Sequence, residues 1–252
     1  MHGLVKCELL KLKRQKVIPI SIIITFIPII LGLFNFKANY AVFKDVNTGD
    51  WLKAWSQVGM FYAPVMLPII SSVYCAIIFR VEYANDNLKI ILSTPVSRKS
   101  LYKSKVIISA LMVLFLQAVF GISYFIFGKL FGITGSFPIS KILELLILGW
   151  VGILPLIAIQ IHLSLKYEDF TKPIMIASIC SLGGFFIGAI SGIRYLWPWA
   201  LQKIPMDLSG GGIEGVIPKA IYILYCLIFA GAMVRIGTKR FENMEKIGRA
   251  HV

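Results

Sequence analysis

The chain has 252 residues, of which 58% are hydrophobic, and its formal net charge is +14. Soluble domains are only about 45–50% apolar, so this composition favours an integral membrane protein and argues against an ordinary soluble domain. The positive charge does not indicate a nucleic-acid partner, because the Lys and Arg residues fall between apolar runs and do not gather on one polar face.

Six stretches are long and apolar enough to cross a bilayer, which requires about 20 residues of helix. In chain order we predict spans at 17–36, 58–79, 106–128, 142–163, 173–193 and 218–236. The first is longer than the apolar core of a cleavable signal peptide. The predicted fold is therefore an all-α integral membrane protein, a six-transmembrane-helix bundle that forms one domain over residues 1–246.

The distribution of basic residues predicts the orientation of these spans. The tails and the loops on their side, 80–105 and 164–172, carry 18 Lys and Arg, and the loops on the opposite side carry 8. Cytosolic loops of membrane proteins are enriched in Lys and Arg. We expect a multi-pass protein of the cytoplasmic membrane with both termini in the cytosol.

Between the second and third spans lies the cytosolic segment "RVEYANDNLKIILSTPVSRKSLYKSK". Ala84, Leu88, Ile91 and Leu92 follow the spacing of one face of a short helix. Pro95 disfavours helix at the residue before it, and a series of basic residues then leads into the third span. Two interpretations are open: an interfacial helix that rests on lipid, or a contact for a partner protein.

Two stretches resemble a known family: the basic start "CELLKLKRQK" and the segment "EYANDNLKIILSTPVSRKSLYKSK". They are similar to the membrane subunits of ABC-2-type ABC transporters, especially the bacitracin and lantibiotic self-protection permeases. That family shows an acidic residue, a short helix, "P-[VI]-S-R" and a Tyr…Lys pair before the next span. The matching residues here are Glu82, Leu88–Leu92, Pro95-Val96-Ser97-Arg98, Tyr102 and Lys105.

The resemblance implies an exporter subunit that is not itself an enzyme. The sequence holds no P-loop of the form G-x-x-x-x-G-K-[ST], so ATP and Mg²⁺ would be used by a separate cytosolic ATPase subunit. The short cytosolic helix would be the coupling helix that contacts this ATPase. The residues we assign to that contact are Glu82, Asp86, Leu88, Ile91, Leu92, Pro95 and Arg98.

A second permease, identical or related, is the other partner that the resemblance implies. Gly184, Gly188 and Gly192 form a GxxxGxxxG stripe in the fifth predicted span. Small residues at this spacing let helix backbones approach closely. The stripe is a candidate permease–permease interface, and packing within one bundle is the alternative.

The resemblance to self-protection permeases implies an amphipathic peptide antibiotic as the cargo, removed from the cell membrane. Candidate substrate contacts are the aromatic side chains of the outer loops and the most polar side chains inside the bundle: Trp51, Trp55, Trp197, Trp199, Gln117 and Gln160. The alternatives are an aromatic belt at headgroup depth for the tryptophans and hydrogen bonds between helices for the glutamines. Another cargo (a drug, an ion or a lipid) and a passive channel are further alternatives.

The four Cys and three His residues form neither a disulfide framework nor a metal site by their spacing. The last six residues, 247–252, read "IGRAHV", which is the translation of ATC-GGA-AGA-GCA-CAC-GTC, part of a common sequencing adapter. We therefore expect this tail to be non-native and assign no function to it.

Overall fold

The computed structural model describes residues 5, 8–10, 15–43, 48–83, 97–167, 169–188, 190, 192–208 and 218–249. All regular secondary structure in the described part is helical, and short turns and loops such as 131–138 connect the helices. Its elements are α2 (Val17–Ala38), α3 (Tyr40–Phe43), α4 (Asp50–Phe61), the π-helical turn η1 (Tyr62–Met66), α5 (Leu67–Tyr83), α7 (Arg98–Leu130), α8 (Ile139–Lys166), α9 (Thr171–Ile187), the short η3 (Ile193–Tyr195), α10 (Lys203–Met206) and α11 (Lys219–Arg249).

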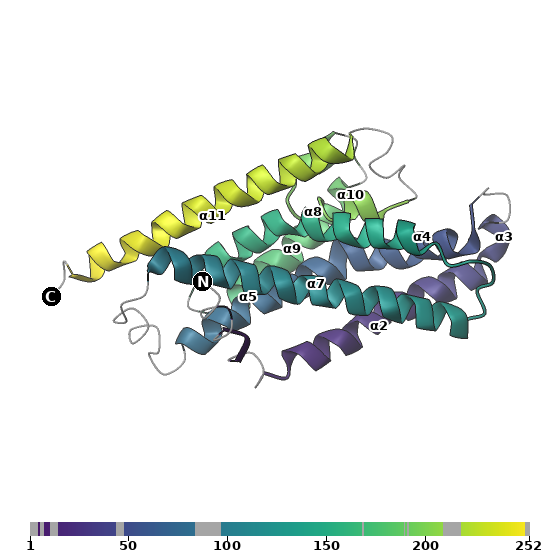
Figure 1. The fold of residues 1–252 in the computed structure, drawn as a ribbon, viewed down its shortest axis with the longest axis horizontal. Coiled ribbons are helices and arrows are strands. Elements are labelled where there is room, and N and C mark those ends of the chain that lie inside the picture. The colour runs from purple at the N-terminus through teal and green to yellow at the C-terminus, as the bar shows by residue number, and fades with distance from the viewer. Residues whose placement is uncertain are drawn as a thin grey trace.

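The long helices form an up-and-down bundle along the long axis of the molecule, with α11 lying obliquely on one side (Figure 1). The end of α5, the start of α7, the end of α8 and the C-terminal part of α11 lie at one end. We call this the tail end. The end of α7, the start of α8 and α3 lie at the other end, which we call the far end.

Five helical segments are long and apolar enough to cross a membrane, namely Val17–Ala38, Asp50–Tyr83, Arg98–Leu130, Ile139–Lys166 and Lys219–Asn243. They confirm the predicted all-α, multi-pass character. The predicted fifth span, 173–193, falls on α9, which ends at Ile187 and has 17 residues. At 1.5 Å per residue α9 is about 25 Å long, somewhat less than the bilayer core of about 30 Å.

The second membrane helix begins at Asp50, eight residues before the predicted start, because α4 continues through η1 into α5. Pro64 and Pro68 lie at this junction. Proline lacks a backbone N–H, and its ring crowds the preceding turn; a wider π turn is one way in which a helix continues past such a position.

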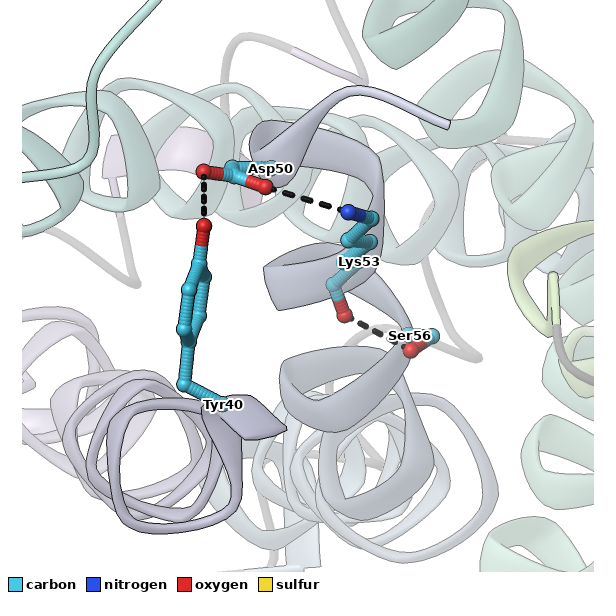
Figure 2. Close-up of polar contacts among 4 residues, drawn as sticks. All are labelled: Tyr40, Asp50, Lys53 and Ser56. Carbon is cyan, nitrogen blue, oxygen red and sulfur yellow. Dashed lines mark hydrogen bonds and ion pairs between the residues drawn. The ribbon is translucent and has the colours of Figure 1, made fainter. Parts of the chain in front are cut away.

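Polar contacts stabilise the start of α4 at the far end (Figure 2). The Tyr40 hydroxyl donates a hydrogen bond to the Asp50 carboxylate at 3.2 Å, and the Lys53 ammonium lies 3.3 Å from the same carboxylate. Ser56 Oγ donates to the Lys53 carbonyl oxygen at 2.7 Å. An acidic residue in the first turn also interacts favourably with the helix dipole.

The far half of the core is aromatic. Trp51 and Trp55 are 1% and 0% exposed. The Trp55 ring packs edge-to-face on Tyr124 with centroids 5.2 Å apart, and Tyr62 stacks on Phe120 at 3.6 Å. The predicted outer loop around these tryptophans is therefore a buried helix.

After α9 the chain returns into the bundle. Residues 199–206 are all buried. The Trp55 indole N–H donates to the Met206 carbonyl oxygen at 3.0 Å, the Gln202 amide donates to Ala63 O at 3.2 Å, and Tyr222 OH donates to Leu201 O at 2.9 Å. This returning segment fills the space among α4, α8 and α11.

The contact between α7 and α4 depends on a glycine. A Cβ at Gly128 would collide with the Trp51 ring, whereas a Cβ at Gly231 on α11 would meet nothing within 4 Å. We expect Gly128→Ala to destabilise the protein by about 1–3 kcal/mol through overpacking. Gly231→Ala should be neutral or stabilising, because alanine favours helix. Thermal unfolding of both variants, followed by tryptophan fluorescence, checks this; equal midpoints would contradict the tight contact.

Candidate functional site

A buried cluster of three charged side chains lies at the tail end of the bundle. Lys105, on α7, is 0% exposed. Its Nζ lies 2.5 Å from Glu82 Oε1 and 3.4 Å from Glu8 Oε1. Both carboxylates are buried, at 1% exposure for Glu82 and 3% for Glu8. We call Glu8, Lys105 and Glu82 the charge cluster.

The cluster joins three separate parts of the chain. Glu82 lies in the last turn of α5, Lys105 lies two turns into α7, and Glu8 precedes α2. The Lys105 ammonium also lies 5.0 Å from the centre of the Phe79 ring on α5, a distance at which a cation is attracted by the ring. The apolar residues that span the membrane thus end in a charged connection at the tail end.

Because the charge cluster is buried, its charged groups must stay in contact with one another. An ammonium group removed from water is stable only when it is paired and hydrogen-bonded. A buried ion pair contributes little net stability compared with apolar residues, yet the loss of one partner leaves a buried charge without compensation. The ends of α5 and α7 are therefore held at a defined separation by the Glu82–Lys105 contact.

The Glu82–Lys105 contact joins the end of α5 to the first turns of α7, and residues 84–96 connect these two helices in the sequence. Each end is also braced by a further helix. Tyr83 OH donates to Leu165 O on α8 at 2.8 Å. On α7, Lys99 pairs with Glu242 of α11 at 3.5 Å. The ends of α5 and α7 are thus joined to each other and to the neighbouring helices α8 and α11.

Tyr102 strengthens the contact between α7 and α11. It is fully buried, its ring centre is 6.1 Å from that of Phe241, and its hydroxyl lies where a Cβ at Gly237 would be. The absence of a side chain at Gly237 lets the tyrosine pack against the α11 backbone. The resemblance included Tyr102 and Lys105, and both are packed inside the chain.

The structure places only two of the residues predicted to contact the ATPase. Asp86, Leu88, Ile91, Leu92 and Pro95 lie outside the described residues, so the coupling helix stays a prediction. Arg98 begins α7 and is partly exposed. Glu82 differs from the expectation of a surface contact, because its carboxylate is turned inward to Lys105.

The sequence alone did not reveal Glu8 as part of this site. In the sequence, Lys105 stands out only as a match to the family pattern and as one of the basic residues before the third span. A signal was present: Glu8 is the acidic residue within the basic start "CELLKLKRQK", and Lys105 is the last charge before a long apolar run. Their pairing over 97 positions could not be inferred from local patterns.

The candidate substrate contacts are mostly inside the bundle. Trp51, Trp55, Gln117 and Gln160 are each at most 1% exposed, and Trp199 is 9% exposed. Tyr62 OH donates to Gln117 at 3.3 Å, as expected for a hydrogen bond between helices. Trp197 is partly exposed and donates to the Cys180 carbonyl oxygen at 3.0 Å. A role in substrate contact stays a prediction, and for the buried residues it requires the helices to separate.

The glycine stripe of the fifth predicted span packs within the chain where the structure describes it. A Cβ at Gly184 would lie 3.0 Å from the Trp199 carbonyl oxygen, and one at Gly188 would lie 3.0 Å from Lys203 Cδ. Gly192 lies beyond the end of α9, with φ of +88°. The stripe is thus shorter on the helix than predicted, and its part in permease–permease packing stays a prediction.

The charge cluster makes a direct prediction about stability. Lys105→Met should cost about 3–5 kcal/mol, because it leaves two buried carboxylates without their cation. Lys103→Met, two residues away at an exposed position, should have little effect. The triple variant Glu8→Gln, Glu82→Gln, Lys105→Met should recover most of the loss. Thermal unfolding in detergent measures all three; a Lys105→Met midpoint equal to that of Lys103→Met would show that the ion pairs are dispensable.

The comparisons with known proteins agree with this architecture. Residues 4–184 match the family model described as ABC-2 family transporter protein. This range includes α2 through most of α9 and all three members of the charge cluster. No curated protein matches the chain, and no solved structure matches it. Within the described residues, no group of three or more His, Cys, Asp or Glu side chains is arranged to hold a metal ion.

The family model covers more than half of the chain, and the helices that it covers have the length and composition of membrane spans. The chain therefore belongs to the ABC-2 family of transporter proteins, multi-pass membrane components of ABC transporters that lack an ATPase domain of their own and associate with an ABC ATPase.

Proposed function

We propose that this chain is the permease half of an ATP-driven exporter and that its ATPase partner acts on segment 84–96. The observation that carries the proposal is the Glu82–Lys105 contact. It connects the two helices from which the segment extends, at the same end of the bundle as the C-terminal part of α11 (Figure 1).

The proposed mechanism is a rigid-body movement. When two ATPase subunits close on ATP, the coupling helix moves with the ATPase surface to which it binds. The charge cluster makes α5 and α7 follow as one unit, and domain movements of this kind occur where packed elements shift without deforming. The bundle then changes its opening to the membrane or to the outside.

We further propose six crossings, with both termini and segment 84–96 in the cytosol. In support, 18 Lys and Arg lie on the side of the tails and 8 lie on the other side. The sixth crossing would be α9 together with the returning segment after it, since α9 alone is short. A second permease, identical or related, would complete the transporter.

Substitutions on the apolar face of the predicted coupling helix test its contact with the ATPase. Leu88→Asp with Leu92→Asp should abolish co-purification of the ATPase with the permease, because charged side chains would enter an apolar contact. Lys89→Asp, off that face, introduces the same carboxylate and is expected to leave co-purification intact. Retention of the ATPase by the double variant would refute the proposed contact.

For the cargo, we propose an amphipathic peptide antibiotic of the lantibiotic or bacitracin-like kind, taken from the membrane. The resemblance of "EYANDNLKIILSTPVSRKSLYKSK" to self-protection permeases supports this. So does the apolar surface after α9, where Ile193 and Leu196 are 52% and 75% exposed. Such side chains would meet the apolar face of a peptide at headgroup depth.

Expression of the permease with its ATPase in a sensitive host tests the cargo. Because the proposed exporter lowers the concentration of peptide in the membrane, we expect the inhibitory concentration of an amphipathic peptide antibiotic to rise several-fold. An ATPase subunit in which the P-loop lysine is replaced serves as the control and should give no protection. Protection against small drugs or ions alone, with none against peptides, would exclude this cargo.

A further inference from the structure

A groove of about 570 Å³ lies between α7 and α8 near the far end of the bundle. Its volume is within the range of about 300–1,000 Å³ that is usual for ligand pockets. All nine residues that line it are apolar, and those used below are Ala118, Gly121, Ile122, Phe125, Phe137 and Leu146.

Small residues on α7 create the groove, and aromatic side chains close it toward the far end. A Cβ at Gly121 would lie 2.6 Å from Leu146 Cδ1, so the missing side chain at Gly121 lets Leu146 of α8 pack against the α7 backbone. Phe125 and Phe137 pack on each other with centroids 5.0 Å apart, and Phe137 packs on Trp51 at 4.9 Å. The walls are therefore held in place by the buried aromatic core.

A cation lies next to this aromatic closure. The exposed Lys129 has its Nζ 6.0 Å from the centre of the Phe125 ring and 5.7 Å from that of Trp51. Within the described part of the chain, no carboxylate lies in salt-bridge range of Lys129. Two acidic residues, one at the start of α4 and one near the start of α8, pair with other lysines: Asp50 binds Lys53 and also Tyr40 (Figure 2), and Glu144 pairs with Lys141 and Lys219.

We propose that this groove binds an anionic phospholipid, with an acyl chain in the groove and the phosphate at Lys129. The apolar walls fit the chain, because lipid is the medium around a membrane-spanning helix pair. The ammonium group fits the headgroup, because a lysine near the end of a span extends toward the membrane surface. Neither a cationic peptide nor a neutral apolar molecule makes use of both features. The inference does not depend on the cargo proposed above.

The test uses the full-length permease with its ATPase in nanodiscs that contain equal amounts of phosphatidylglycerol and phosphatidylcholine. A photo-crosslinking benzoylphenylalanine replaces Ile122 in the wall of the groove, and mass spectrometry identifies the attached lipids. We expect cross-links to phosphatidylglycerol to exceed those to phosphatidylcholine about fivefold, because the attraction between one lysine and an anionic lipid favours binding by about that factor. The same probe at Ile27, an exposed position on α2, should show a ratio of about one.

Two variants and a control distinguish a specific lipid site from general contact with the membrane. Lys129→Gln should bring the ratio at Ile122 down to about one, while Lys103→Gln, at the tail end of the same helix, should leave it unchanged. Ala118→Trp should fill the groove and remove the excess. A ratio of one for the Ile122 probe without further substitutions would overturn the proposal, as would cross-links that go to a second permease chain in place of lipid.

Discussion

The structure depends on one constraint: an ammonium group buried at the end of a membrane bundle must keep its carboxylate partners. Lys105 meets this constraint through Glu82 and Glu8. Because these residues come from α5, α7 and the segment before α2, the same contacts that compensate a charge also determine where three parts of the chain meet. Apolar contacts hold the bundle together along its length, and ion pairs determine the positions of the chain segments at this end.

This arrangement suits a membrane subunit that associates with a separate ATPase. The segment between α5 and α7 can transmit movement only if both of its ends are firmly attached to the membrane helices. The charge cluster, Tyr83 on α8 and the Lys99–Glu242 pair supply that attachment. At the other end, the aromatic core and the returning segment around Met206 pack α4, α8 and α11 together. The two ends of the bundle are thus held together differently, by buried ion pairs at the tail end and by aromatic packing at the far end.

Sequence patterns predicted most of the helices, but some boundaries were wrong for identifiable reasons. Asp50, Lys53 and Ser56 read as a polar outer loop, yet they begin a buried helix because their polar groups find partners in Tyr40, in each other and in the backbone. Arg98 to Lys105 read as a basic connection, and they form the first turns of α7. At 33 residues α7 is about 50 Å long, more than a bilayer core needs, so its charged start extends beyond the apolar region.

The sequence by itself determined the class of the protein, the approximate positions of most spans and the resemblance to the ABC-2 family. These features follow from composition, from apolar runs about 20 residues long and from a local motif, all of which are carried by neighbouring residues. Only the tertiary structure decided that Glu82 faces Lys105, that Glu8 joins them, and that Trp51 and Trp55 are core residues. Such pairings join side chains up to 97 positions apart, and the burial that makes them strict exists only once the helices have packed.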